Sequence, residues 1–352
     1  MALPRLADVD DLDAGHVLAL PPGPGPEAVE ILATSRFPRA TWEVPAAVGA
    51  NGGTRTRATM PPGVLRLSRL STLTGPFHLE RDVAAELGLP VPGGTAYLLR
   101  APVERGAPPW PGAGDRDGLA RAFPDGLPVR DELRMLEWLI AVARRLAGAV
   151  RTAAGRDGRD PVILAPDPAA AVDLTVWSDL WLDPDGALAV MRQALPRAYL
   201  NLPGGTWRGP LPKEGTGVVP GTEPLTEEQR RHLALEAEAF DEATLASPPP
   251  MEAYGLLADL ELDGMIALEI GPEDPPPVVA SLPWAAKGAV AYRVRWEPVD
   301  EADLEAERAS IAHRVARGRA TPLVVAVARA VHAHVGGEIT DMMGFVVDPA
   351  HL

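Results

Sequence analysis

The segment Asp82–Arg100 reads DVAAELGLPVPGGTAYLLR, and a second segment, Pro277–Arg295, reads PVVASLPWAAKGAVAYRVR. The two align without a gap and are identical at 7 of 19 positions, including Tyr97/Tyr292 and Arg100/Arg295. Side chains alternate between apolar and polar around each tyrosine, which predicts a strand in both places. A segment that recurs within one chain indicates two related units.

Shorter matches flank this segment and occur in the same order. They pair Phe37-Pro-Arg-Ala40 with Leu195-Pro-Arg-Ala198, Ile140–Arg144 with Val325–Arg329, and Asp167-Pro168 with Asp348-Pro349. Any one of these could arise by chance in a chain so rich in Ala, Pro and Arg, but their shared order favours duplication. We therefore expect a first unit over residues 1–168 and a second over residues 169–352.

The second unit carries an insertion. The offset between matching segments grows from 158 to 195, so about 37 residues are added before Pro277. Thr226 with Gln229 has the pattern of a capping box, and Pro248 would stop a helix. These signals predict an extra helix over Glu227–Leu245, in an insert at about 225–247.

Both units predict the same order of elements. In the first we expect strand 17–20, helix 27–36, strand 41–44, a strand around Tyr97, helix 131–153 and strand 162–164. In the second we expect strand 174–177, turn 183–186, helix 187–195, strand 199–202, a strand around Tyr292, helices 301–317 and 322–335, and strand 345–347. Thr321 as N-cap, Pro322 at the first helical position and Gly336 after the end delimit the last helix.

This order is that of a ferredoxin-like, split βαβ unit. The fold class predicted is therefore α+β, with two tandem diverged ferredoxin-like units whose antiparallel sheets carry helices on one face. The linker over 165–172 is short, which favours two units packed together as a pseudo-dimer.

Composition limits the possible chemistry. The chain has 352 residues and no cysteine, which excludes disulfides, thiolate metal sites and cysteine nucleophiles. The N-terminal residues lack the pattern of a secretion signal, and the apolar run 323–335 is interrupted by Arg329 and His332. We expect a cytoplasmic protein that neither spans nor binds a membrane.

Charge is distributed unevenly between the two units. Residues 1–168 hold 19 Arg and 20 Asp or Glu, whereas residues 169–352 hold 14 Lys or Arg and 28 Asp or Glu. A strongly acidic surface repels phosphate backbones, so nucleic acid is not expected as a partner. The acidity serves either solubility or a basic protein partner.

One segment of the first unit is basic. No acidic residue lies within 44–79, which contains Arg55, Arg57, Arg66 and Arg69. This segment could bind an acidic partner or a phosphorylated ligand. We favour the interpretation that it complements the acidic second unit.

The repeated tyrosine and arginine are the candidate ligand-binding residues. Tyr97 and Arg100 are three apart on a strand and point to opposite faces, as do Tyr292 and Arg295. The tyrosines could line one pocket between the units while an arginine holds an anion. The alternative is that each tyrosine is a core residue and each arginine is solvated.

Trp177 and Trp181 are candidates for partner binding, or for packing at the seam between the units. His332, His334 and Glu338 do not form a metal site by spacing, because residues two apart on a helix point in different directions. No cofactor is expected, and neither a Ser-His-Asp order nor a phosphate-binding loop is visible.

Two functional hypotheses follow. The first is a non-enzymatic binding or regulatory protein, of the immunity or accessory type, that presents an acidic face to a basic protein. The second is a small-molecule-binding protein or enzyme whose pocket lies between the two repeats, near Tyr97, Arg100, Tyr292 and Arg295.

Overall fold

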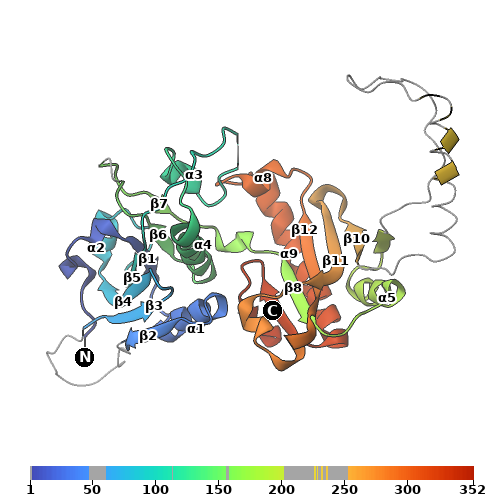
Figure 1. Cartoon of the computed structure of the whole chain (residues 1–352), viewed down its shortest axis with the longest axis horizontal. Helices are drawn as coiled ribbons and strands as arrows, with labels where there is room; N and C mark the ends of the chain where they lie inside the picture. Colours follow the sequence, from blue (N-terminus) through green and yellow to red (C-terminus); the bar gives the residue numbers. More distant parts are fainter. Residues whose placement is uncertain are drawn as a thin grey trace.

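The computed structural model describes residues 2–46, 61–112, 114–155, 158–201 and 253–352, together with six residues between 226 and 236. Figure 1 shows two bodies of sheet and helix, the first blue to green and the second yellow-green to red. We call residues 1–168 the first half and residues 169–352 the second half.

In the described part of the first half, seven antiparallel strands form one sheet in the order β2-β3-β4-β5-β1-β6-β7. Its strands are β1 (His16–Leu20), β2 (Thr41–Val44), β3 (Gly63–Arg66), β4 (Thr72–Leu79), β5 (Gly94–Arg100), β6 (Ala149–Arg151) and β7 (Ile163–Leu164).

The described residues of the second half form another antiparallel seven-stranded sheet, in the order β9-β10-β11-β12-β8-β13-β14. Its strands are β8 (Leu174–Ser178), β9 (Tyr199–Asn201), β10 (Tyr254–Asp259), β11 (Met265–Glu273), β12 (Ala289–Glu297), β13 (Glu338–Asp341) and β14 (Val346–Val347). The strand order is the same as in the first sheet when β8 is matched to β1.

The pairing registers of the two sheets also correspond. Leu18 of β1 pairs with Tyr97 of β5, and Val176 of β8 pairs with Tyr292 of β12. Leu18 and Val176 are 158 residues apart, and Tyr97 and Tyr292 are 195 residues apart. These are the offsets between the matching segments of the sequence. The α+β class with antiparallel sheets is confirmed, whereas descent by duplication and a pseudo-dimer arrangement stay predictions.

The sheets are wider than a four-stranded split βαβ unit. As that unit requires, β1 lies between the strand before the long helix and the strand after it. The described residues between the two main helices, however, contain four strands, β2 to β5, and a further strand, β7, pairs with β6. The architecture remains consistent with two tandem ferredoxin-like units that have been extended at both edges.

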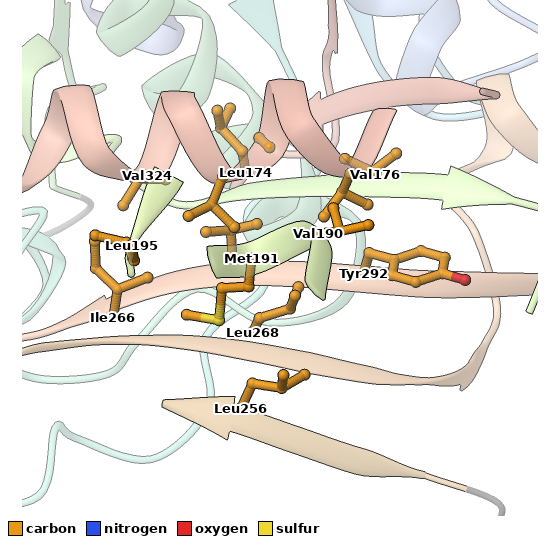
Figure 2. Close-up of a cluster of buried hydrophobic side chains, with 14 of the residues drawn as sticks. Leu174, Val176, Val190, Met191, Leu195, Leu256, Ile266, Leu268, Tyr292 and Val324 are labelled. Atoms are coloured by element: carbon orange, nitrogen blue, oxygen red, sulfur yellow. The ribbon is translucent and has the colours of Figure 1, made fainter. Parts of the chain in front are cut away.

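Two helices cover the same face of each sheet. In the first half these are α1 (Pro26–Arg36) and α4 (Arg130–Arg145), and in the second α5 (Pro184–Ala194) and α9 (Ile311–Val335). Figure 2 shows the second core, where Val190 and Met191 of α5 meet Val176, Leu268 and other strand residues. Burial of such side chains is the main stabilising term in each half.

The remaining helices in the described residues are short. They are η1 (Leu6–Asp8), η2 (Leu12–Ala14), α2 (Arg81–Glu86), α3 (Leu119–Ala122), η3 (Pro168–Ala170), η4 (Glu261–Asp263), α7 (Pro277–Ala280), η5 (Pro283–Lys287), α8 (Ala302–Glu305) and η6 (Pro349–His351). No helix among the described residues is long and apolar enough to cross a membrane.

Three predicted helix boundaries are wrong. The helix expected over 131–153 ends at Arg145, because Ala147 adopts a positive φ and the chain turns into β6. The turn expected at 183–186 is the first turn of α5, since Asp183 caps the helix by accepting a hydrogen bond from the Gly186 N–H.

The third wrong boundary concerns α9. It is one helix capped by Ser310, not two helices separated at Gly318 and started by Thr321. Pro322 lies inside it and cannot donate to the Gly318 carbonyl four residues earlier. Gly318 is exposed, so water can reach that carbonyl, while the Thr321 hydroxyl donates to the Arg317 carbonyl at 2.8 Å. The helix continues because the lost bond is on the solvent side.

The insert at 225–247 lies largely outside the described residues. Of the residues between 226 and 236 that the structure describes, Glu228, Arg231, His232, Leu235 and Glu236 are helical. The predicted end of this helix at Leu245 lies outside the described residues.

The turn between β13 and β14 joins the two halves. Phe345, 1% exposed, belongs to the core of the first half together with residues of α1 and α4, and Met343 packs beside it. The Asp115 N–H donates to the Glu305 carbonyl at 2.9 Å, and Arg121 forms an ion pair with Glu307 at 2.7 Å. The first core is therefore completed by a side chain from the end of the second half.

Candidate functional site

The two repeated tyrosines lie in two separate cores. Tyr97 is fully buried in the first core, and Tyr292 is fully buried in the second core. Figure 2 shows the Tyr292 hydroxyl pointing away from the apolar cluster. That hydroxyl donates to the Leu180 carbonyl at 2.7 Å and accepts from the Leu182 N–H at 2.9 Å. The expected common pocket of tyrosines is wrong, because each ring fills the helix-covered side of its own sheet.

The repeated arginines point to the opposite face from the tyrosines, as predicted, but they are not brought together. Arg100 is exposed at the end of β5. Arg295 is partly exposed, lies 3.3 Å from Glu269, and lines a cavity between the two halves. Of the four proposed ligand-binding residues, Arg295 alone lines a described cavity at this interface.

The two tryptophans contact residues of the second half. Trp177 is buried with Val279, Ala289 and Ala291, and its indole N–H donates to the Thr340 hydroxyl at 2.9 Å. The ring of Trp181 packs edge-on against Tyr254 and is 38% exposed. The seam interpretation is wrong for Trp177, whose cluster contains residues of the second half, and partner binding by Trp181 stays a prediction.

The basic segment 44–79 does not complement the second half through its described residues. Arg66 forms an ion pair with Glu43 of the neighbouring strand, and Arg69 is exposed. Arg55 and Arg57 lie outside the described residues. The first half instead contributes Arg121 and Arg145 to ion pairs with the second half, and these arginines lie outside the segment.

No group of three or more His, Asp or Glu side chains in the described residues is arranged to hold a metal ion. His332 and His334 each lie within hydrogen-bond distance of a backbone carbonyl, those of Gly337 and Ala330.

The main difference between the halves lies on the face of each sheet opposite the helices, which we call the outer face. In the first half this face is apolar and covered. Phe77, Leu79, Ala96 and Leu98 are buried there beneath η1 and α2, and Leu6 of η1 is fully buried. The N-terminal segment thus forms a second layer over the first sheet.

In the second half the outer face of β9–β12 is not covered by any residue that the structure describes. A hollow of about 520 Å³ lies on it, and its lining includes Gly255, Leu257, Ala267, Glu269, Gly271 and Arg293. The end of the face near β8 is covered by the cluster of Val279 and Trp177 around α7 and η5, and Arg295 and Glu297 border the first half.

Ion pairs organise the uncovered outer face. Arg293 contacts Glu273 at 2.6 Å and Glu269 at 3.8 Å, and each of these side chains is about 40% exposed. Pairs this exposed stabilise a fold by about 1 kcal/mol or less. Asp259 and Glu297 on the same face add carboxylates, so four acidic side chains face two arginines, Arg293 and Arg295.

The outer face of the second sheet has a partial signal in the sequence. In β11, Ile266, Leu268 and Ile270 alternate with Ala267, Glu269 and Gly271. Period-two alternation of this kind predicts a strand with one buried and one polar face. Without the register of β10 and β12, the acidic and basic side chains could not be placed next to each other.

Comparison of the chain with models of protein families, with curated proteins and with solved structures finds no match.

Proposed function

We propose that this chain is a binding or regulatory protein that presents the outer face of β9–β12 to a basic protein partner. The observation that carries the proposal is the contrast between two sheets of the same strand order. One outer face is apolar and covered by the chain itself, and the other is polar and uncovered by any described residue.

Charge supports a basic partner. The outer face has four carboxylates against two guanidinium groups, and the second half as a whole carries 28 acidic against 14 basic residues. Complementary charge increases association rate and selects partners, and it disfavours nucleic acid here.

The shape of the face suits a protein segment. The centre of the face consists of small residues, so it is shallow. They are Gly255, Ala267, Gly271 and Ala291, and the longer side chains of Glu269, Glu273 and Arg293 lie next to them. Small residues on a strand leave room for close approach of another backbone. Leu257 and the half-exposed Tyr199 add apolar contact at the β9 side.

The test compares two variants of equal charge change. Glu269→Gln with Glu273→Gln alters the outer face, and Asp185→Asn with Glu86→Gln alters exposed acids elsewhere. Each tagged protein is used to capture partners from a lysate of the source cell, and the retained protein is purified for titration and for hydrogen exchange.

We expect the wild type and the control to retain one basic protein at a stoichiometric level. The outer-face variant should bind it about tenfold more weakly, and exchange in β11 and β12 should slow in the complex. Equal affinity for both variants, protection elsewhere, or no retained basic protein would overturn the proposal.

A further inference from the structure

A cavity of about 460 Å³ lies between the two halves and borders the outer face at Arg295 and Glu297, which belong to its lining. Arg116 and Arg144 line it from the first half, Asp173 from the connecting segment, and Arg295, His313 and Arg317 from the second half. A cavity of this size holds a small metabolite, and its position at a domain interface is common for ligand sites.

Arg116 is a partly buried cation without a close counterion. Its guanidinium donates to the Ala170 carbonyl at 2.8 Å and lies 3.5 Å from the Met342 sulfur. No carboxylate of the described residues lies within ion-pair distance of it. Buried charges are normally paired, because desolvation of an isolated ion is strongly unfavourable.

A second guanidinium lies near the first. Arg144 is 3% exposed, forms an ion pair with Asp117 and contacts the Met343 sulfur at 3.4 Å, but its Nε has no hydrogen-bond partner among the described residues. Burial, and then the charge of Arg144, lower the pKa of Arg116, and Asp117, Asp173 and Glu305 offset this only in part. The two arginines thus repel each other, and Arg144 has a carboxylate partner in Asp117 whereas Arg116 has none within ion-pair distance among the described residues.

His313 adds an unpartnered polar atom on the side of the second half. It is 6% exposed and packs against the Trp296 ring, and its Nδ1 has no hydrogen-bond partner in the described structure. Burial lowers the pKa of His313. A neutral imidazole presents one donor and one acceptor, so it can hydrogen-bond a polar ligand without adding charge.

We propose that this cavity binds a small organic anion through a carboxylate or phosphate group held by Arg116 and Arg144. Guanidinium groups match the oxygens of a carboxylate or phosphate, and an anion would supply a counterion to Arg116 and a hydrogen-bond acceptor to the Nε of Arg144. Acidic residues on the lining of the second half, including Glu301, Asp303 and Glu307, disfavour long polyanions. The proposal is independent of partner binding at the outer face.

The probes are inorganic phosphate and succinate, each compared with chloride at equal ionic strength. Thermal unfolding and isothermal titration are measured for the wild type, for Arg116→Gln and for Arg69→Gln, an exposed arginine of the first half. We expect at least one anion to raise the Tm of the wild type and of R69Q. The affinity of R116Q should fall about tenfold or more.

In chloride alone, R116Q should unfold at a higher temperature than the wild type, since a charge near Arg144 is removed. If R116Q does not fold, Arg116→Lys keeps the charge but loses the planar fork, and its affinity should fall about threefold or more. Anion effects that are equal in the wild type and in the Arg116 variants, or absent in the wild type for both probes, would overturn the proposal. A response to phosphate but not succinate, or the reverse, assigns the chemical group and supports it.

Discussion

The outer faces of the two sheets occupy equivalent positions and have opposite character. Leu98 of β5 corresponds to Arg293 of β12, and the neighbouring Phe77 and Leu79 correspond to Gly271 and Glu273. The first set is buried under the N-terminal segment, whereas the charged members of the second set are about 40% exposed. Two sheets with the same strand order can therefore differ in what covers them. The cover depends on a few side chains of one face.

The largest loss of stability is expected when an apolar residue of the first outer face is replaced by the charged residue found at the equivalent position of the second. Leu98→Arg would bury a charge without a partner beneath η1 and should reduce the free energy of unfolding by about 4 kcal/mol or more. Chemical denaturation followed by circular dichroism measures it. A loss below about 1 kcal/mol would show that the N-terminal layer does not seal the first outer face.

The N-terminal segment that covers the first outer face gives the next largest expected loss of stability. Leu6 is fully buried, so Leu6→Ala should destabilise the protein by about 2–4 kcal/mol through lost burial and a residual cavity. Leu262, 91% exposed on a short helix of the second half, is the matched control, and L262A should change stability by about 0.5 kcal/mol or less. Equal losses in denaturant unfolding would contradict the described difference in cover.

Stability should depend on pH in opposite ways through one carboxylate of each half. Burial alone would raise the pKa of Asp131 in the first half, but hydrogen bonds from Ser71, Ser68 and Arg134 hold it below its usual range. Burial raises the pKa of Asp173 in the second half, against the opposing hydrogen bond from the Trp296 N–H.

The signs of the two Asn substitutions should therefore differ. The lowered pKa of Asp131 gives stability that is present above its unfolded pKa and lost as pH falls through the folded pKa, so Asp131→Asn should lose on the order of 1 kcal/mol at pH 7. The raised pKa of Asp173 makes stability fall as pH rises from the unfolded to the folded pKa, so Asp173→Asn should be more stable than wild type at pH 7. Thermal unfolding between pH 3 and pH 8 tests both, and equal signs at pH 7 would count against this account.

The smallest effect is expected at the counterpart of Leu98. Arg293→Leu removes exposed ion pairs and should change the free energy of unfolding by about 0.5 kcal/mol or less. Denaturation under the conditions used for L98R gives the direct comparison. A loss similar to that of L98R would mean that the second outer face is as dependent on its side chains as the first.

Much of the first part of each unit could be predicted from sequence. Strand 41–44 and the end of helix 27–36 agree with β2 and α1, because Pro38 follows the helix and Pro45 follows the strand. The end of α4 was missed because Ala143 to Ala149 is an apolar stretch interrupted only by Arg, and the turn depends on a positive φ at Ala147. Pro322 predicts the start of a helix, whereas α9 continues through it because the hydrogen bond that proline removes lies on the solvent side.

The candidate sites were predicted only in part. Arg295 was named from the repeat, and it does line the cavity between the halves. Arg116 and Arg144 have no such signal in the sequence, because their burial and the missing ion-pair partner of Arg116 are properties of tertiary packing. The same holds for the uncovered outer face, which is defined by what the rest of the described chain leaves exposed.

The position of Phe345 has a consequence for synthesis of the chain on the ribosome. The strands of the first sheet are complete at Leu164, yet the core beneath α1 and α4 lacks this ring until residue 345 has emerged. At 5–20 residues per second this interval of about 180 residues lasts roughly 10–40 s. During that time the nascent first half has an unfilled apolar site, which a chaperone or another chain could occupy before the protein's own residue arrives.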